Sequence, residues 1–567
     1  MLCRYPKNGC SFICPGLATA LRPEHRKVVR PILGTGWIKV ELPWRAPLNV
    51  SPLGNWMKRI NTAITVCILA YFVVVALWYA VSAPLDHDEH QFMASAFLVA
   101  RYGRQPYQDF AYFHMPNLVY LYALFFLLPY PFTLARLFSG FCGFGLCLAI
   151  FMSARSLFAE EDTLKRLILP IASTALLVHS PLFAYASSHV WNHTPSTLCA
   201  VVAFFWLCRA IRGNNALWYF FLSGLGLGMA IGIRLSFAPV ILPFLLAVVF
   251  RTGTVRDKGL NTMAFALGGL LANLPAVYFL LTSPDGFLFG NLGYAQLNTI
   301  YRQEMTFLGQ MTLAEKIKYI KNSVFAQPGE LVILVVTLYS GGLLGIEMMG
   351  KKARPSLESM LLLLILPFVY LGCIAPTPAW YQYYFALVPF MILLSLYTLS
   401  SLVGSAFCDA ATLLIAVSAL ISIIYGSPSK NASVMRGLMS PESWTPNRVQ
   451  RAAENISVYV NARDGEGEIL TLSPLYAILG GTPIYKEFVT GPFAWRVSYL
   501  LSEEDAVKRG LPVPTKIESF LEERHPRAIL TGEEEKQLEA PLINAAQQLG
   551  YQRTVTASGV VAWLPPK

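Results

Sequence analysis

Long apolar segments recur through the first three quarters of this 567-residue chain. An α-helix needs about 20 predominantly apolar residues to cross the hydrocarbon core of a bilayer. Only 14% of the residues are charged, whereas soluble proteins carry about 25%. The sequence therefore predicts a polytopic α-helical membrane protein with about eleven transmembrane helices, at residues 61–82, 131–152, 167–186, 196–212, 216–233, 236–250, 260–281, 330–349, 358–375, 383–403 and 409–425.

Composition divides the chain into three parts. Residues 1–56 show no clear periodicity, and we expect them to form a poorly ordered N-terminal extension. Residues 57–426 contain all the predicted spans. Residues 427–567 are more polar, and stretches such as "GEILTLSP" and "PRAILTG" indicate short buried strands between helical segments. This alternation predicts a small C-terminal α/β soluble domain, which contains no Gly-rich phosphate-binding motif.

Basic residues in the short links between spans indicate which side of the membrane is cytoplasmic. The links on one side carry Arg155, Lys165, Arg166, Arg209, Arg212, Arg251, Arg256, Lys258, Lys351, Lys352 and Arg354. The long loop 282–329 on the other side carries three lysines, but long loops count less in this rule. An odd number of spans then places the tail outside the cytoplasm. The net charge of the whole chain is +11. In a membrane protein an excess of Lys and Arg is usual in the cytoplasmic links, so this charge does not indicate nucleic-acid binding. The sequence also has no nucleic-acid-binding motif, and we expect no nucleic-acid partner.

Residues 83–130 form the predicted first external loop. The stretch "EHQFMASAFLVARY" is typical of a helix that lies along the membrane surface, because one helical face collects Phe92, Met93, Ala96, Phe97, Val99 and Ala100. The stretch "NLVYLYALFFLLPY" is short for a span, and we expect a second juxtamembrane helix there. If that stretch crossed the membrane, the sidedness of every later segment would invert. The basic links after residue 152 argue against such a crossing.

The stretch "PLDHDEHQF", just after the first span, gathers titratable groups at the edge of the membrane. A carboxylate at such a boundary is costly unless it is solvated or used. Asp86, Asp88 and Glu89 could simply cap a solvated helix and occupy its first turn. A divalent metal site is a second interpretation, since His87 and His90 flank the acids. No third strong ligand is evident, so we assign no metal ligands.

An active site is the third interpretation of these acids. About twenty residues further on, the turn "PYQDF" supplies another carboxylate, Asp109. The intervening amphipathic helix would bring Asp109 back towards the first cluster. A base and an orienting acid at the outer face of the membrane would then be available for general acid–base catalysis.

The order of these features resembles that of the GT-C glycosyltransferases. It comprises a span that ends in Asp-Glu, a surface helix, a Gly-x-x-Pro-Tyr-x-Asp-Phe turn and a Pro-led aromatic helix. The chain is similar to the protein O-mannosyltransferases and the lipid A aminoarabinose transferases over residues 57–425, most sharply in "DHDEHQ". Members of that family transfer sugars from polyprenyl-phosphate donors on the non-cytoplasmic face. The resemblance implies a GT-C enzyme of the bacterial inner (plasma) membrane, with a periplasmic C-terminal domain.

The same resemblance implies catalytic roles. Asp88 and Glu89 match the family's first-loop Asp-Glu pair, so Asp88 is the expected general base, with Glu89 and Asp109 as further catalytic residues. Relatives have His-Pro-Pro or Lys-Pro before the second surface helix, whereas this chain has His114 followed by Met-Pro-Asn. That departure leaves the role of His114 open.

Other residues are candidates for substrate binding. Arg234 ends the "GLGLGMAIGI" span, where it either snorkels to the interface or, as in similar proteins, binds the lipid phosphate. Some relatives have an aspartate in the second external loop, and this chain has asparagine and histidine there. The tyrosines of "PAWYQYYFALVPF" are either an aromatic belt or the lining of the sugar groove. The expected substrate-binding residues are Asp86, Arg101, Arg104, His114, Asn192, His193, Arg234, Tyr381 and Tyr383.

The predicted function is inverting transfer of a sugar from a polyprenyl-phosphate donor to a hydroxyl of a glycan, lipid or protein acceptor. No cofactor is required with certainty, and a divalent metal stays open. Membrane lipids are the remaining expected partners. The alternative is a lipid or glycan transporter or flippase without transferase chemistry. A transporter would have charged residues near the midplane of its spans and broken helices in paired halves, and the sequence contains few such charges.

Overall fold

The structure, a computed structural model, describes residues 52–213, 215–307, 309–350, 355–402, 406–426, 437–463 and 467–566. The predicted extension 1–56 lies outside these residues except for its last five, which belong to helix α1 (Pro52–Ser82). The chain divides into two compact units, Met1–Ile64 and Thr65–Lys567. Of the first unit the structure describes only the beginning of α1, and everything below concerns the second.

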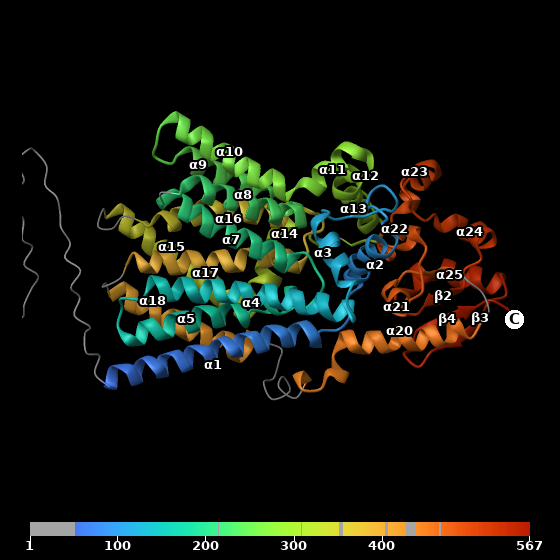
Figure 1. Ribbon diagram of the computed structural model, residues 1–567, viewed down its shortest axis with the longest axis horizontal. Helices are drawn as coiled ribbons and strands as arrows, with labels where there is room; N and C mark the ends of the chain where they lie inside the picture. The colour runs from blue at the N-terminus through green and yellow to red at the C-terminus, as the bar shows by residue number, and fades with distance from the viewer. Residues whose placement is uncertain are drawn as a thin grey trace, which may run out of the picture. The chain divides into compact units, whose positions relative to one another are not determined.

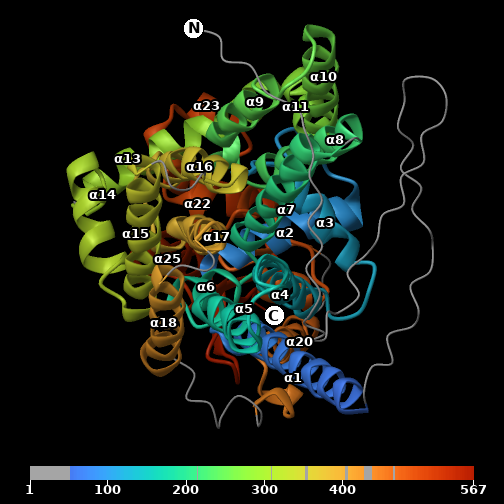
Figure 2. The same cartoon turned by 90° about the vertical axis from the view of Figure 1, so that its left-hand side faces the viewer.

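Eight helices in the described ranges are long and apolar enough to cross a membrane (Figure 1). Helix α17 (Leu387–Ser400) is buried along nearly its whole length and lies at the centre of the bundle in Figure 2; the 3-10 turn η4 (Tyr381–Ala386) leads into it. The others are α1, α4 (Pro131–Leu157), α7 (His193–Arg212), α8 (Ala216–Ile233), α15 (Pro328–Met349), α16 (Leu357–Ile374) and α18 (Ala406–Ile421), which continues into η5 (Ser422–Gly426).

A bent pair of helices makes a ninth possible crossing. Helices α10 (Val255–Ala272) and α11 (Leu274–Thr282) meet at 68°. Pro275 at the start of α11 cannot donate a backbone hydrogen bond. The side chain of Asn273 at the bend donates instead to the carbonyls of Gly228 and Gly269, both at 2.9 Å. The break is therefore satisfied inside the protein, as a membrane interior requires.

Two of the predicted spans, 167–186 and 236–250, are shorter than expected. The segment 167–186 divides into α5 (Thr163–Val178) and α6 (Pro181–Ala186), because Ser180 caps a new helix that starts at a proline. The segment 236–250 consists of the 3-10 turn η1 (Leu235–Val240) and α9 (Ile241–Val249). Nine of the eleven predicted spans thus match long or bent crossings, and two match these shorter apolar elements.

Glycines allow helices α8 and α10 to pack at close range. A Cβ atom at Gly268 would lie 2.0 Å from the carbonyl oxygen of Phe221, and one at Gly224 would lie 1.9 Å from that of Phe265. Small residues at such crossings let two backbones approach in a membrane, where packing rather than water exclusion drives association. These positions explain the Gly-rich sequence of α8.

The first external loop forms helices α2 (His87–Tyr102) and α3 (Asn117–Phe125), and α3 is too short to cross a membrane. The prediction that α2 lies along the membrane surface is wrong. Its residues from Glu89 to Leu98 are all buried, because α3 covers one side and the C-terminal domain covers another. In Figure 1, α2 lies between the long helices and the C-terminal domain.

The second long external loop consists of short helices. They are α12 (Pro284–Leu288), the π-turn η2 (Phe289–Gly293), α13 (Tyr294–Glu304), α14 (Leu313–Tyr319) and the π-turn η3 (Ile320–Val324). Lys316 of α14 donates hydrogen bonds to the carbonyls of Ile374 and Pro376, both at 2.8 Å. This lysine therefore connects the loop to the segment between α16 and α17.

The C-terminal domain is a small α/β domain, as predicted. Its four strands have the order β1-β2-β4-β3, with β1 and β2 parallel and the other pairs antiparallel. The strands are β1 (Ile469–Thr471), β2 (Ala528–Thr531), β3 (Gln552–Val555) and β4 (Val561–Leu564). The helices and 3-10 turns are η6 (Pro441–Ser443), α20 (Thr445–Asn461), α21 (Leu475–Leu479), η7 (Lys486–Phe488), α22 (Pro492–Trp495), η8 (Ser498–Leu500), α23 (Glu503–Lys508), η9 (Pro514–Lys516), α24 (Ile517–Arg524) and α25 (Lys536–Gln548).

The C-terminal domain contacts both external loops. The backbone N–H of Leu475 donates to Nδ1 of His90 at 3.2 Å. Burial lowers the pKa of this histidine to about 3, so it stays neutral and able to accept. Tyr499 donates to the carboxylate of Glu304 in the second loop. The domain is therefore held against the loops that carry the predicted site.

Candidate active site

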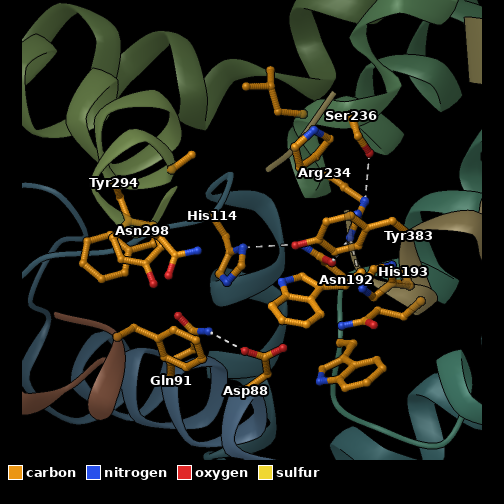
Figure 3. Close-up of a pocket in the computed structure, with 18 of the residues that line it drawn as sticks. Asp88, Gln91, His114, Asn192, His193, Arg234, Ser236, Tyr294, Asn298 and Tyr383 are labelled. Carbon is orange, nitrogen blue, oxygen red and sulfur yellow. Dashed lines mark hydrogen bonds between the residues drawn. The ribbon is translucent and has the colours of Figure 1, made fainter. Parts of the chain in front are cut away.

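A cavity of about 410 Å³ opens where the two external loops, the ends of several membrane helices and the C-terminal domain meet (Figure 3). Among the predicted site residues, the cavity is lined by Asp86, Asp88, His114, Asn192, His193, Arg234 and Tyr383. These residues come from four separate segments of the chain. The volume lies in the range of about 300–1,000 Å³ that is typical of small-molecule sites.

Glu89 does not line the cavity, and it forms a buried ion pair below it. Its carboxylate accepts two hydrogen bonds from the guanidinium of Arg136, one of them at 2.6 Å from Nε, and both side chains are 0% exposed. It also accepts from the backbone N–H of Val190 at 2.8 Å and of Asp86 at 3.1 Å. The structure therefore gives Glu89 a positioning contact rather than a contact with substrate.

Arg136 uses its remaining N–H groups on the end of α1. It donates to the carbonyl oxygens of Ala80, Ala83 and Pro84 at 2.9 to 3.1 Å. The pair of Arg136 and Glu89 thus joins the end of α1, the start of α2, helix α4 and the loop before α7. A buried pair with every hydrogen bond satisfied is rigid, and breaking it leaves an uncompensated charge.

Asp88 projects from the first turn of α2 into the cavity. Asp86 caps this helix and accepts from the backbone N–H of Asp88 at 2.9 Å, while the Asp88 carboxylate accepts from the side chain of Gln91 at 3.2 Å. Burial, aided by the charge of Asp86, raises the pKa of Asp88 to about 6, although His87 and Arg496 oppose the rise. A carboxylate with this pKa is a suitable general base near neutral pH.

Three residues of the acidic cluster have the donor chemistry of a metal site. Ligand atoms of Asp86, His87 and Asp88 lie within 4.8 Å of one another. His87 is exposed, and the two aspartates are half-buried. Carboxylate and imidazole donors suit several divalent cations, so these residues fit a metal, although Asp86 also serves as the helix cap. The second histidine of the motif, His90, points instead to Leu475.

Arg234 lies at the C-terminal end of helix α8, and three polar side chains contact its guanidinium. Nη1 donates to Oδ1 of Asn192 at 2.9 Å and lies 3.1 Å from Nε2 of His193, while Nε donates to Ser236 at 2.8 Å. The guanidinium carbon lies 4.6 Å from the ring centre of Tyr383, as Figure 3 shows. No carboxylate of the described residues forms a salt bridge with Arg234. Its positive charge is therefore available to an anion in the cavity.

His114 lies between Asp88 and Arg234 in Figure 3. Its ring stacks on Phe92 with centroids 4.5 Å apart, and Nδ1 lies 3.5 Å from Nδ2 of Asn192. Burial and the charge of Arg234 lower the pKa of His114 to about 3. Nε2 has no hydrogen-bond partner within the described part of the chain. A neutral imidazole with a free nitrogen is suited to bind a substrate hydroxyl.

Besides Glu89, four predicted site residues do not line this cavity. Asp109 is exposed, and its carboxylate accepts from the backbone N–H of Gln105 at 2.6 Å, so it stabilises its own turn. Arg101 is exposed at the end of α2, and Arg104 lies over the ring of Tyr102 at 5.8 Å. The ring of Tyr381 packs on Tyr185 with centroids 6.0 Å apart. The amphipathic helix therefore does not bring Asp109 into the cavity with Asp86 and Asp88.

Several cavity residues were absent from the prediction. The loop 282–329 contributes Asn291, Tyr294, Asn298 and Arg302, and the C-terminal domain contributes Phe493 and Arg496. Arg136 and Gln91 complete the set around the acidic cluster. Of these residues only Arg136 could have been found from the sequence. It lies inside an apolar span, where an arginine is costly unless it is paired or used. Nothing local in the sequence indicates that the other segments meet.

Of the comparisons with known proteins, only the one with solved structures gives matches. No protein-family model matches the sequence, and no curated protein matches it. Among solved structures, ArnT from Cupriavidus metallidurans bound to undecaprenyl phosphate is 12% identical, with a TM-score of 0.58 over 89% of this chain and 100% of ArnT. The apo state of that protein gives a TM-score of 0.56 at 12% identity, over 89% of this chain and 99% of that one.

A more distant match is the apo form of the Archaeoglobus fulgidus oligosaccharyltransferase. It is 12% identical, with a TM-score of 0.46 over 82% of this chain and 69% of that one. ArnT, a lipid A aminoarabinose transferase, is a GT-C glycosyltransferase, and the likeness to it spans nearly the whole of both chains. This polytopic membrane protein with a C-terminal α/β domain therefore has the GT-C fold that its sequence predicts.

Proposed function

We propose that the protein is an inverting glycosyltransferase that moves a sugar from a polyprenyl-phosphate donor to an acceptor hydroxyl. The observation that carries the proposal is the shared cavity of Asp88 and Arg234, a base and an unpaired cation at the external ends of apolar helices. ArnT, whose fold is similar, binds undecaprenyl phosphate, and this supports the same class of donor here. A lipid-linked sugar is already activated, so the reaction would need no nucleotide pocket.

In the proposed reaction, Asp88 accepts the proton of the acceptor hydroxyl as its oxygen attacks the anomeric carbon. The bond from that carbon to the phosphate oxygen breaks, and the bonding electrons leave with the polyprenyl phosphate. Attack opposite the leaving group inverts the anomeric configuration. Gln91 and the helix cap orient Asp88, and Glu89 holds the helix end in place through Arg136.

Arg234 would stabilise the charge that develops on the leaving phosphate. A guanidinium can hold two phosphate oxygens at once, and the contacts of Arg234 to Asn192, His193 and Ser236 fix its orientation before substrate binds. Such a preorganised charge in a partly dry site stabilises the transition state more than mobile water would. The ring of Tyr383 supports the cation from behind.

A divalent metal is part of this proposal only as an option. Asp86, His87 and Asp88 would hold it, and it would supply positive charge to the phosphate or lower the pKa of a bound hydroxyl. In the proposed reaction, protein groups alone transfer the proton and bind the phosphate.

The direction of the reaction relative to the membrane is also proposed. The positive links predict that the cavity and the C-terminal domain face the periplasm of a bacterial inner membrane. Acceptors on that face are glycans, lipids or proteins of the cell envelope. A transporter without chemistry stays the alternative, but it gives no reason for a carboxyl with a pKa of about 6 in the same cavity as an arginine that forms no salt bridge with a carboxylate of the described residues.

Substitutions of Arg234 test the donor side of the proposal. Purified full-length protein in nanodiscs would receive a panel of polyprenyl-phosphate sugars with an envelope extract as acceptor, and donor consumption would be measured at limiting donor. Arg234→Lys should keep part of the turnover and Arg234→Ala should lose about 10²–10³-fold. Arg104→Ala, which removes an arginine outside the cavity, should have little effect. Unchanged turnover in Arg234→Ala would refute the assignment.

A further inference from the structure

Two more arginines line the cavity at a distance from Arg234. They are Arg302 of helix α13 and Arg496 at the end of α22 in the C-terminal domain. Nη2 of Arg496 donates to the hydroxyl of Tyr294 at 3.0 Å. Figure 3 shows Tyr294 on the opposite side of the cavity from Arg234 and Tyr383, with Asp88 below and between them.

Arg496 is held firmly and is almost enclosed. Only 8% of the residue is exposed, and its guanidinium lies 4.6 Å from the ring centre of Phe493. Its backbone is positioned by Gly491, which has a φ of 58° and where a Cβ would lie 2.5 Å from the carbonyl oxygen of Leu472. Nε of Arg496 is buried and has no partner in the described part of the protein. The guanidinium lines the cavity, while Nε lies just beneath its surface.

Arg302 lies close to Arg496 around a shared aromatic ring. The two guanidinium carbons lie 5.7 Å and 5.8 Å from the ring centre of Tyr301, and Arg302 also lies 5.4 Å from that of Trp380. Its Nε is likewise buried without a partner among the described residues. Burial, and then the charge of Arg496, lower the pKa of Arg302.

Neither of these positive charges is paired directly with a carboxylate in the described part of the chain, although the Asp88 carboxyl also interacts electrostatically with Arg496. Neither arginine forms a salt bridge with a carboxylate of the described residues, although Glu534 and Glu535 lie near enough to influence them electrostatically. Two like charges in a partly desolvated site raise the free energy of the empty protein. An anion bound between them would relieve that repulsion and accept hydrogen bonds from the guanidinium groups that line the cavity.

The position of the pair indicates which substrate carries the anion. In an inverting displacement the nucleophile and the leaving group approach the anomeric carbon from opposite sides. Arg234 is assigned to the leaving phosphate, so the group across the cavity belongs to the acceptor. We propose that Arg302 and Arg496 form a second anion subsite, which binds a phosphate or carboxylate of the acceptor. This inference rests on the proposed function, and it makes the C-terminal domain a direct contributor of acceptor specificity.

The subsite can be tested without turnover. Full-length protein in nanodiscs of neutral phosphatidylcholine would be saturated with undecaprenyl phosphate and titrated with inorganic phosphate, with binding followed by calorimetry. We expect wild type to bind phosphate without displacing the lipid. Arg302→Gln and Arg496→Gln should each weaken phosphate binding by about 10- to 100-fold, with unchanged thermal stability. Arg509→Gln is the matched control, because Arg509 also stacks on a loop ring, that of Phe289 at 4.4 Å, but lies outside the cavity.

Three results would overturn the subsite. The first is no phosphate binding by wild type, and the second is phosphate binding by the Arg302→Gln/Arg496→Gln double variant that equals that of wild type. The third is displacement of undecaprenyl phosphate by phosphate, since that would indicate one shared site. A second experiment tests whether the anion belongs to the donor sugar instead of the acceptor. It measures the affinity of wild type and of the double variant for two undecaprenyl-phosphate sugars, one with a neutral sugar and one with a carboxylate-bearing sugar. Equal affinity of the double variant and wild type for both supports an acceptor anion, and a selective loss for the carboxylate-bearing donor contradicts it. Failure of sugar transfer with phosphate binding intact would refute the proposed function and leave the anion subsite in place.

Discussion

The carboxyl group of Asp88 experiences opposing influences that set its pKa. Burial and the neighbouring Asp86 raise the pKa to about 6, whereas His87, Arg496 and Gln91 favour the ionised form. The group is therefore ionised at neutral pH and still basic enough to accept a proton. A solvated helix cap, the simplest interpretation of the sequence, does not account for a carboxyl recessed in a polar cavity.

This pKa predicts the acid limb of the pH profile. Below about pH 6 Asp88 is protonated and cannot accept a proton, so kcat/KM for donor consumption should fall about tenfold per pH unit there. Above that value Asp88 is fully deprotonated, so kcat/KM should level off until another group titrates. Initial rates from pH 4.5 to 8 at limiting donor would measure the limb. A rate independent of pH between 5 and 7 would contradict the role of Asp88.

Breaking the ion pair of Glu89 and Arg136 should lower the stability of the protein as well as the rate of transfer. Breaking a fully buried pair costs about 3–5 kcal/mol, and both side chains are 0% exposed. Glu89→Gln should therefore lower the thermal midpoint in detergent markedly and also reduce transfer, because the first turn of α2 would shift with Asp88. Glu503→Gln is the control, since it breaks an exposed pair with Lys516 worth at most about 1 kcal/mol. Equal midpoints for the two variants would show that the buried pair is not structural.

The sequence predicted the site residues on one side of the cavity but not Arg302 and Arg496 on the other. Asp88, Asn192, His193 and Arg234 lie near the ends of predicted spans, and His114 lies in a loop between two of them. Membrane topology brings such ends and loops to one face of the bilayer. Arg302 and Arg496 enter the cavity through the tertiary docking of a loop and a separate domain. No periodicity or spacing encodes that docking, so these residues could not be predicted.

At the scale of single elements, helix α2 shows how an apolar face can be misread. Its predicted apolar stripe exists, but polar residues on the other side, among them Gln91 and Ser95, are buried as well. The stripe packs on α3, and the polar side meets the cavity and the C-terminal domain. Hydrophobic patterning reports which face is apolar, and it cannot tell a lipid surface from a protein surface.

The close crossing of α8 and α10 gives a prediction for helix packing. Gly268→Ala would place a Cβ 2.0 Å from a carbonyl oxygen of α8, so the helices must separate, at a cost of about 1–3 kcal/mol. Gly269→Ala is an adjacent control whose nearest contact would be an ordinary 3.6 Å, and it should be neutral or slightly stabilising. Thermal unfolding in one detergent would compare the two. A Gly268→Ala protein as stable as the Gly269→Ala protein would contradict this packing.

At the scale of the whole molecule, the long apolar spans were sufficient to predict the architecture. Most spans and the C-terminal α/β domain are where composition placed them. The exceptions, α5 with α6 and η1 with α9, are segments in which prolines or a helix cap interrupt a hydrophobic run. Hydropathy averages over a window and cannot see such interruptions.

The predicted topology places the C-terminal domain on the same face as the cavity, outside the cytoplasm. Reporter fusions at residue 430 should give a periplasmic signal, with alkaline phosphatase active and a cytoplasmic fluorescent reporter dark. Fusions at residue 256, in a basic link, should give the opposite pattern. A cytoplasmic signal at 430 would invert the assigned sidedness and place the reaction on the wrong face for a periplasmic acceptor.

The most direct test of the proposed transferase is donor consumption by wild type and by Asp88→Asn. Both proteins, purified in nanodiscs, would receive polyprenyl-phosphate sugars with envelope extract, and released polyprenyl phosphate would be measured by mass spectrometry. Wild type should release it from at least one donor. Asp88→Asn keeps the shape of the side chain but cannot accept the proton, so its rate should fall by about 10²–10⁴-fold with unchanged folding. Release by Asp88→Asn at the wild-type rate, or no release by wild type from any donor, would contradict the account.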